Sequence, residues 1–245
     1  MKENKYDDPI FFQKYGQMAR SQQGLAGAGE WAELRKLLPD FRGLSLLDLG
    51  CGYGWHCKYA AEQGAALVLG TDISQSMLEE AARRNSGPNI QYRQAAMEDL
   101  SFPDGSFDVV LSSLAFHYIQ DFPALVQRIS RWLKPGGQLI FSVEHPVFTA
   151  YGSQDWIYDG EGNILHFPVD RYYLEGARAA VFLGEAVTKY HRTLTTYLGT
   201  LTDHGFQLQQ VVEPQPPQHM MDLPGMRDEL RRPMMLLVSA SKKNG

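Results

Sequence analysis

The sequence is poor in cysteine and has no long hydrophobic run. Its only cysteines, Cys51 and Cys57, lie within one motif and provide neither a disulfide framework nor the spacing of a four-ligand zinc site. No stretch approaches the roughly 18 consecutive apolar residues needed to cross a bilayer. The first residues, MKENKYDDPIFF, carry acids where a signal peptide has a basic start and an apolar core. We therefore expect a reduced, cytoplasmic protein that has no membrane partner.

Positive charge is also scarce. The chain has 23 Lys and Arg against 28 Asp and Glu, which gives a net charge of −5. Proteins that bind nucleic acids usually present a basic face to the phosphates, and the basic pairs here are isolated: 83–84, 231–232 and 242–243. A nucleic-acid partner is therefore disfavoured. Internal repeats and low-complexity segments are lacking as well, so the composition favours one globular domain.

What the chain does have is an alternation of apolar strands and amphipathic helices. Five predicted strands cover residues 44–50, 66–72, 90–95, 107–113 and 138–145. Helices are predicted between them, with Ser74 and Asp121 as N-caps and Pro135-Gly136-Gly137 as a break. A further helix (191–205) and two strands (206–214 and 233–242) follow, and we expect the two strands to form a hairpin-like edge. This pattern predicts an α/β fold of the Rossmann-like, doubly wound kind, with a mostly parallel sheet of seven strands whose last strand is antiparallel.

Two segments fall outside the alternation. Residues 1–43 read as an N-terminal helical arm, and residues 146–190 have weak periodicity and nine aromatic side chains. Such an aromatic density argues against disorder, and long excursions from compact domains are often lids. We therefore expect a single domain, residues 1–245, with an arm (1–43), a core (44–145), a substrate cap inserted after the fifth strand (146–190) and a C-terminal helix and strands (191–245).

A glycine-rich turn follows the first strand. Gly50, Gly52 and Gly54 allow the backbone to bend sharply and to approach a ligand, while Asp48 precedes them and Asp72 ends the second strand. An acid at the end of the second strand can bind both hydroxyls of a ribose. A nicotinamide dinucleotide site and an adenosyl site both fit this arrangement. The dinucleotide fingerprint needs a glycine where this chain has Trp55, so a NAD-dependent oxidoreductase is the remote alternative.

The combined motifs resemble the class I S-adenosylmethionine-dependent methyltransferases, in particular the small-molecule branch with a type 11-like methyltransferase domain. The segments that carry the resemblance are LLDLGCGYG, TDIS, AAMEDLSFPDGSFDVVLSSLAFHYI and LKPGGQLIFSVEHP. The resemblance implies S-adenosyl-L-methionine as cofactor, S-adenosyl-L-homocysteine as product and an unidentified small molecule as acceptor.

The resemblance also assigns roles at matching positions. Asp72 would bind the ribose, and Ala96 stands where many relatives have an aspartate for the adenine amino group, so that contact needs another source. Met77 could pack near the ribose, and Tyr15 and Arg20 of the arm could close over the methionine carboxylate. The other predicted cofactor-binding residues are Asp48, Gly50, Cys51 and Gly52 at the methionine end, Ile73, Met97 and Glu98 around the adenine, and Ser113 and Leu114 near the sulfonium.

Candidates for catalysis follow the fourth and fifth strands. His117 could be a base or a cofactor contact, and His145 is predicted to face the substrate; Arg192 could clamp an acidic acceptor. No spacing enforces a metal site, although Glu144, His145 and His166 could converge. The aromatic surplus suggests a planar or apolar acceptor, or a methylated ammonium held by cation–π contact. A non-catalytic S-adenosylmethionine-binding protein and a methyltransferase for RNA or protein remain alternatives, and the sequence assigns no oligomeric state.

Overall fold

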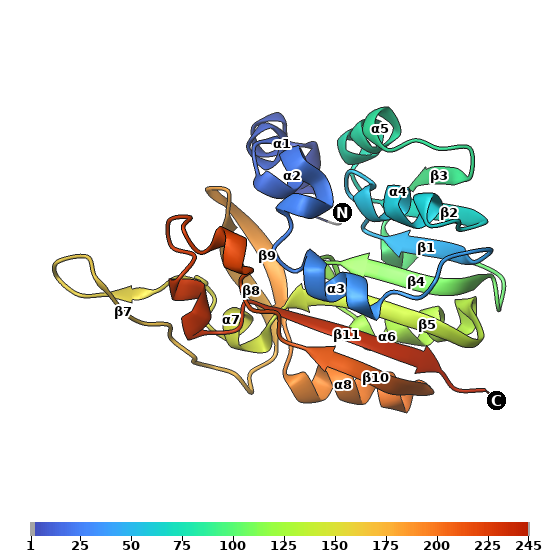
Figure 1. Cartoon of the computed structure of the whole chain (residues 1–245). Coiled ribbons are helices and arrows are strands. Elements are labelled where there is room, and N and C mark those ends of the chain that lie inside the picture. The colour runs from blue at the N-terminus through green and yellow to red at the C-terminus, as the bar shows by residue number, and fades with distance from the viewer. Residues whose placement is uncertain (1–2, 245) are drawn as a thin grey trace.

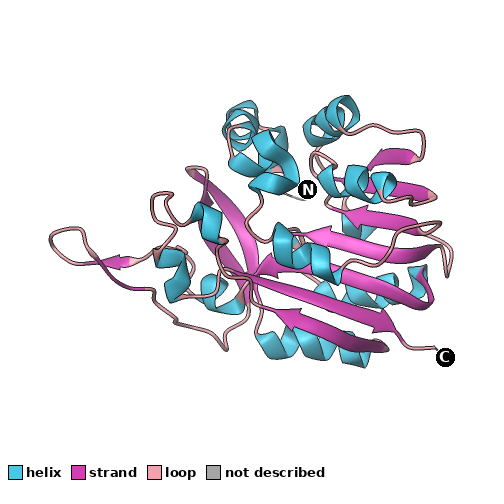
Figure 2. Ribbon diagram, in the orientation of Figure 1, coloured by secondary structure: helices cyan, strands magenta, loops and turns pink. Residues whose placement is uncertain are grey.

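A computed structural model describes residues 3–244, so residues 1, 2 and 245 of the predicted domain lie outside the described residues. A seven-stranded sheet forms the centre of the molecule (Figures 1 and 2). Its strands, in spatial order, are β10 (Phe206–Val212), β11 (Met235–Lys242), β5 (Leu133–Glu144), β4 (Phe107–Ser113), β1 (Ser45–Leu49), β2 (Leu67–Asp72) and β3 (Ile90–Gln94). Strands β1 to β5 pair in parallel, and β11 is antiparallel to both of its neighbours. The predicted fold class is therefore confirmed.

Helices cover both faces of the sheet because the strands bury alternate residues on opposite sides. Leu47 and Leu49 of β1 join one hydrophobic cluster with residues of α6 and α8, whereas Leu46 joins a second cluster with residues of α3, α4 and α5. These helices are α3 (Trp31–Leu37), α4 (Trp55–Glu62), α5 (Gln75–Arg84), α6 (Phe122–Trp132) and α8 (Leu194–Asp203). The predicted caps are confirmed: Ser74 accepts from Met77 N, and Asp121 accepts from Ala124 N.

Several predicted boundaries are wrong. Strand β5 begins directly after α6, at Leu133, because residues 134–137 bulge out of the pairing with β4 instead of forming a separate turn. Helix α8 begins at Leu194, because Thr193 caps it, and His191 belongs to the preceding strand. Strands β10 and β11 do pair with each other. Of these two strands, however, β10 alone forms an edge of the sheet, because β11 lies between β10 and β5.

The N-terminal arm is helical, as the sequence predicts. Its elements are η1 (Lys5–Asp7), α1 (Pro9–Gly16), α2 (Ala19–Gln23) and η2 (Gly24–Gly27), followed by α3. Asp8 caps α1, and Pro9 occupies its first turn, where a missing N–H costs nothing. In Figure 1 the blue α1 and α2 lie beyond the carboxyl ends of the central strands.

The segment after β5 forms a short helix and two hairpins. These elements are α7 (Pro146–Ala150), β6 (Ile157–Tyr158), β7 (Ile164–His166), β8 (Gly176–Phe182) and β9 (Glu185–His191). The β8–β9 hairpin stands next to the arm, whereas the β6–β7 hairpin projects away from the molecule (Figure 1). Short 3-10 turns complete the fold: η3 (Met97–Asp99), η4 (Phe116–Tyr118), η5 (Gln218–Met220) and η6 (Asp228–Arg231). Within residues 3–244, no helix has both the length and the apolar composition that a membrane span needs.

Candidate active site

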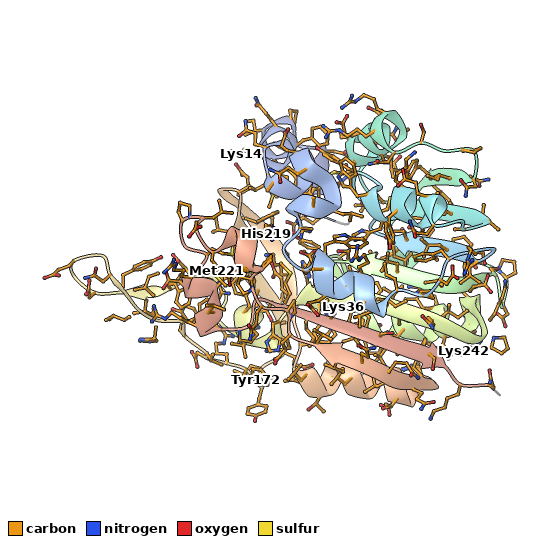
Figure 3. The ribbon with its side chains drawn as sticks, viewed as in Figure 1. Lys14, Lys36, Tyr172, His219, Met221 and Lys242 are labelled. Carbon is orange, nitrogen blue, oxygen red and sulfur yellow. The ribbon has the colours of Figure 1, made fainter. Side chains whose placement is uncertain are left out.

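A cavity of about 690 Å³ lies at the carboxyl ends of β1, β2, β4 and β5. We call arm residues 3–20 together with the β8–β9 hairpin the roof, because both line the cavity opposite the strand ends. The roof is held by Thr188 N, which donates to Glu3 Oε1 at 3.2 Å, and by Lys14 Nζ of α1, a residue labelled in Figure 3, which donates to Leu183 O at 3.0 Å. Phe11 packs between Ala180 and Val187 in a small apolar cluster of its own.

Most of the residues predicted for the site line this cavity. They are Tyr15, Arg20, Gly50, Gly52, Asp72, Ile73, Met77, Ala96, Met97, Glu98, Ser113, Leu114 and His117. Cys51 lines a smaller cavity of about 70 Å³ that shares Tyr15, Gly50 and Gly52 with the large one. Asp48 and His145 line neither cavity.

The glycine turn forms a cradle for a ligand. Gly50 has a φ of +74°, and a Cβ there would lie 2.5 Å from the Cβ of Ala115. Gly52 has a φ of +52°, and a Cβ there would meet no atom within 4 Å. Because Gly52 also lines the cavity, a side chain at this position would occupy ligand space. The turn thus fits a ligand that approaches the backbone closely.

Asp72 is oriented by the turn that it faces. Its Oδ2 accepts from Gly52 N and its Oδ1 from Ser74 N, each at 2.9 Å. Burial raises the pKa of Asp72, although the two backbone N–H groups oppose that effect. A carboxylate offers about four acceptor positions, so this fixed group can still bind the two hydroxyls of a ribose.

Asp48 lies beneath the turn and is only 1% exposed. Cys57 Sγ donates to its Oδ2 at 3.3 Å, and its Oδ1 has no partner among the described residues. Burial raises the pKa of Asp48 to about 7. Asp48 therefore supports the turn from below and does not contact the cavity directly.

The arm is anchored to the second strand and its helix by Asp7, a residue that the sequence did not indicate. Asp7 Oδ1 accepts from Ser74 Oγ at 2.6 Å and from Ser76 N at 3.0 Å. Tyr6, next to it, lines the cavity between Tyr15 and Tyr118, with ring centroids at 5.4 and 6.3 Å. The aspartate and the tyrosine together bring the arm over Asp72.

Arg20 lines the cavity, but it already has a partner. Its Nη2 donates to Oε1 and Oε2 of Glu30 at 2.6 and 2.8 Å, and Glu30 is 2% exposed. A guanidinium has five N–H donors, so Arg20 can bind a carboxylate only with those that Glu30 leaves unused.

The surroundings of the predicted adenine region are apolar. Met77 and Met97 are 2% and 9% exposed and line the cavity beside Ile73. Arg128 Nη1 donates to Glu98 O at 2.5 Å and thereby fixes the backbone of this turn. Flexible methionine side chains suit contact with a planar ring.

Leu114, at the end of β4, has a φ of +53°, which is rare for a residue with a side chain. Its N–H donates to Ser142 O at 2.9 Å and to Ser142 Oγ at 3.1 Å. The neighbouring strand β5 therefore stabilises a strained backbone at the cavity wall, as is common in functional sites.

The two predicted catalytic histidines differ in position. His117 lines the cavity, and its Nδ1 accepts from Glu144 N at 3.4 Å. His145 does not face the cavity, contrary to the prediction: it caps α7 by accepting from Val147 N, and its Nε2 lies 2.8 Å from Glu213 Oε1. Pro146 begins α7, and this turns the His145 ring away from the strand ends.

Burial lowers the pKa of His117 to about 4, so the ring is neutral near pH 7. Since Nδ1 accepts a hydrogen bond, the neutral ring carries its hydrogen on Nε2. Of the two predicted roles, base or cofactor contact, a contact made by donating from Nε2 fits this neutral ring better than that of a base.

Lys189 and Glu144 form an ion pair at the end of the cavity away from Asp72. Lys189 Nζ lies 2.6 Å from Glu144 Oε1, and both residues line the cavity. Sequence analysis assigned Glu144 only a possible metal role and did not single out Lys189. The signal for Lys189 was the alternation in β9, where Val187, Lys189 and His191 point to the same buried side. Among the described residues, no three His, Cys, Asp or Glu side chains converge as a metal site, and Glu144, His145 and His166 do not meet.

Several aromatic residues of the predicted cap, and the basic residues Arg192 and Arg232 that follow it in the sequence, have internal partners. The Arg232 guanidinium carbon lies 4.5 Å from the ring centre of Phe148, 5.1 Å from that of Trp156 and 4.7 Å from that of Phe167. None of these rings lines the cavity, and from this segment only Phe182 and Tyr190 supply aromatic surface to it. Arg192 Nη2 donates to the carbonyl oxygens of Ile119 and Gln120, so it does not face the cavity as a clamp.

The chain is similar in sequence and structure to known proteins. The methyltransferase domain family of type 11 matches residues 47–141. A solved Listeria monocytogenes protein assigned to the S-adenosylmethionine-dependent methyltransferases is 56% identical, with a TM-score of 0.86 over 90% of this chain and 99% of that one. An S-adenosylmethionine-dependent methyltransferase from Mesorhizobium loti is 43% identical, with a TM-score of 0.83 over 89% and 100% of the two chains. Phosphoethanolamine N-methyltransferase 1 from Arabidopsis thaliana is 37% identical over 52% of this chain, but over only 26% of its own length.

The glycine cradle, the oriented Asp72 and the roofed cavity thus occur in a chain that is similar over nearly its full length to two solved proteins assigned to the S-adenosylmethionine-dependent methyltransferases. The chain belongs to the class I S-adenosylmethionine-dependent methyltransferase family.

Proposed function

We propose that this methyltransferase transfers the methyl group of S-adenosylmethionine to a small-molecule acceptor within the roofed cavity, and that it acts in the cytoplasm. One observation carries the proposal: a single cavity of about 690 Å³ extends from Asp72 to Glu144 beneath the roof. This volume lies within the usual range of small-molecule sites. The two free cysteines agree with a reducing compartment.

The cofactor would occupy the half of the cavity next to the glycine turn. Asp72 would bind the ribose hydroxyls, while Met97 and Ile73 would contact the adenine. Gly50 and Gly52 would admit the methionine part, with Cys51 and Arg20 nearby and Asp48 supporting the turn. The remaining predicted contacts of this half are Tyr15, Met77, Ala96, Glu98, Ser113 and Leu114.

The acceptor would occupy the other half, next to His117, Glu144 and Lys189. When bound, the sulfonium of the cofactor supplies an activated methyl group. The chain's own residues have three tasks: to hold the acceptor in line with that methyl group, to exclude water and to fix the acceptor's polar atoms. The roof contributes to the second task, and His117 Nε2–H contributes to the third.

The segment 146–190 acts only in part as a substrate cap in this proposal. Phe182, Val187, Thr188 and Tyr190 of the β8–β9 hairpin line the cavity, but no residue of the β6–β7 hairpin does. The named activity of the Arabidopsis relative on a small molecule, phosphoethanolamine, supports an acceptor of this size class, although the match covers about a quarter of that protein.

The test is transfer of a radiolabelled methyl group from S-adenosylmethionine in a metabolite extract. The extract is divided by ultrafiltration into a small-molecule fraction and a macromolecular fraction. We expect label in the small-molecule fraction, strong loss of labelling with Asp72→Ala and no change with Lys36→Met, a substitution on the outer side of α3 (Figure 3). Label confined to RNA or protein would contradict the proposed acceptor class. Binding of S-adenosylhomocysteine without any transfer would instead favour a non-catalytic binding protein.

A further inference from the structure

The acceptor half of the cavity contains a closed set of buried charges. Lys189 Nζ contacts Glu144 Oε1 at 2.6 Å and Gln154 Oε1 at 2.9 Å, and Gln154 Nε2 donates to Glu144 Oε2 at 2.7 Å. The Lys189 side chain is 4% exposed and that of Glu144 is 14% exposed. Each carboxylate oxygen therefore has a partner, and the pair as a whole has no net charge.

The groups around this pair add no charge to it. Burial raises the pKa of Glu144, but the Lys189 ammonium and the hydrogen bonds from Lys189 and Gln154 lower it, so the pKa is lowered overall and the carboxylate stays ionised. His117, which packs against the pair from η4, is neutral near pH 7. The guanidinium of Arg192 is bonded to the carbonyl oxygens of Ile119 and Gln120.

The other buried side chains of the acceptor half are mostly aromatic or aliphatic, whereas Glu3 and Lys5, which also line the cavity, belong to the roof: Glu3 is exposed and accepts from Thr188 N, and Lys5 is half-buried. Tyr6, Tyr118, Phe182 and Val187 line the acceptor half, and the hydroxyls of Tyr6 and Tyr118 lie 3.3 Å apart. The buried polar contacts available beside the pair are therefore neutral ones, such as the His117 Nε2–H and the two phenol groups, and a contact with the exposed Glu3 carboxylate would be screened by water.

A charged acceptor would meet a penalty in such a site. Transfer of an ion into a buried site is costly unless an opposite charge pairs with it. Here Glu144 already pairs with Lys189. A bound ammonium would be repelled by the Lys189 ammonium, and a bound carboxylate would be repelled by the Glu144 carboxylate. Neither ion would find an unpaired opposite charge in this buried pair. A neutral acceptor with a hydrogen-bonding atom has no such cost and can accept from His117.

We propose that Glu144 and Lys189 form a charge-selecting pair that restricts the acceptor site to molecules whose bound part is uncharged, such as a phenol or an alcohol. This inference rests on the proposed function, because it assumes that the acceptor binds at this end of the cavity. It assigns specificity to a side-chain pair that makes no contact with the glycine turn.

The test compares three probes of similar size: phenol, benzoate and benzylammonium. Their dissociation constants are measured by ligand-detected NMR at neutral pH with saturating S-adenosylhomocysteine. For the wild-type protein we expect phenol to bind at least about tenfold more tightly than either ion, a difference of about 1.4 kcal/mol. The binding of phenol should weaken in His117→Ala and recover in part in His117→Gln, which restores an N–H donor.

Variants of the pair should change the order of affinities in opposite directions. Glu144→Gln leaves the Lys189 ammonium without its counter-ion, so benzoate should gain at least about tenfold relative to phenol. Lys189→Met leaves the Glu144 carboxylate unpaired, so benzylammonium should gain by a similar factor. The double variant removes both charges and should return to the wild-type order. Lys36→Met, on the exposed Lys36–Glu33 pair, is the matched control and should leave the order unchanged.

Two further measurements separate the possible failures. Calorimetric titration with S-adenosylhomocysteine should give the same affinity for every variant, and thermal unfolding identifies a variant that does not fold. If the wild-type protein ignores S-adenosylhomocysteine, the proposed function fails. If it binds S-adenosylhomocysteine but binds an ion as tightly as phenol, binds none of the probes, or keeps its order in both single variants, the charge-selecting pair is refuted.

Discussion

Substitution of three glycines by alanine separates backbone strain, steric clash and loss of ligand space. Gly43, Gly50 and Gly52 have φ values of +75°, +74° and +52°, so each alanine would adopt a left-handed conformation at a cost of about 1–2 kcal/mol. At Gly43 and Gly52 the new Cβ meets nothing within 4 Å, whereas at Gly50 it lies 2.5 Å from Ala115 Cβ. The three variants therefore share the backbone strain, whereas only Gly50→Ala adds a steric clash and only Gly52→Ala places a methyl group in open ligand space.

For Gly50→Ala, the clash with Ala115 adds an overpacking cost of about 1–3 kcal/mol. We therefore expect the free energy of unfolding to fall by roughly 2–5 kcal/mol, with a loss of S-adenosylhomocysteine binding as the turn shifts. Gly52→Ala should lose only about 1–2 kcal/mol of stability. Its affinity for S-adenosylhomocysteine should nevertheless fall by at least about tenfold, because the methyl group enters the cavity.

Gly43→Ala is the control, since it has the strain without the clash and lies outside both cavities. It should resemble Gly52→Ala in stability and the wild-type protein in affinity. The assays are urea unfolding and calorimetric titration with S-adenosylhomocysteine. Unchanged affinity in Gly52→Ala would refute the role of the turn as a cofactor cradle, and equal stability of Gly43→Ala and Gly50→Ala would refute the steric argument.

Three further predictions concern stability and the arm. The pKa of Asp48 is raised to about 7 from 3.8, so its stabilising contribution is full below pH 3.8 and is lost as the pH rises through 7. As the pH rises over this range, the free energy of unfolding of the wild-type protein, measured with urea, should fall by up to about 4 kcal/mol relative to that of Asp48→Asn. Parallel curves of unfolding free energy against pH for the two proteins would contradict the raised pKa of Asp48. Asp7→Ala removes the contacts to Ser74 and Ser76, so hydrogen exchange of residues 3–16 should accelerate and S-adenosylhomocysteine should bind more weakly. The control is Asp121→Ala, which removes the cap of α6. It should lower the free energy of unfolding by roughly 1 kcal/mol without a change in the affinity for S-adenosylhomocysteine. Arg232→Met should lose about 1–2 kcal/mol of unfolding free energy in a thermal or urea assay, because the guanidinium contacts three rings; an unchanged value would show that these contacts contribute nothing.

Local patterns were sufficient to predict which residues of the glycine turn and of the second strand lie together at one side of the cavity. Gly50, Gly52 and Asp72 belong to a strand, a turn and a second strand that are close in the sequence, and parallel pairing brings the strand ends together. The caps Ser74 and Asp121 depend only on neighbouring residues and were also predictable. The nicotinamide alternative was wrong, and the absence of a glycine at position 55 had already disfavoured it.

The acceptor half could not be predicted because its contacts join distant segments. Glu144 and Lys189 are 45 positions apart, and Glu3 and Thr188 are 185 apart. No local pattern encodes such a pairing. His145 was misassigned for a related reason: its position after β5 was correct, but the direction of its ring depends on α7 and on Glu213. Likewise, three of the nine aromatic side chains of residues 146–190 pack around Arg232 and do not line the cavity.

The position of β11 between β5 and β10 has a consequence for how the chain acquires its structure. β10 pairs with β11 alone, so residues 206–212 join the sheet only through residues 235–242. Until residues 235–242 pair with β5, the β5 edge presents unpaired backbone groups, which are a template for association with other chains. During synthesis the late emergence of β11 therefore sets the period in which this protein is most prone to aggregate.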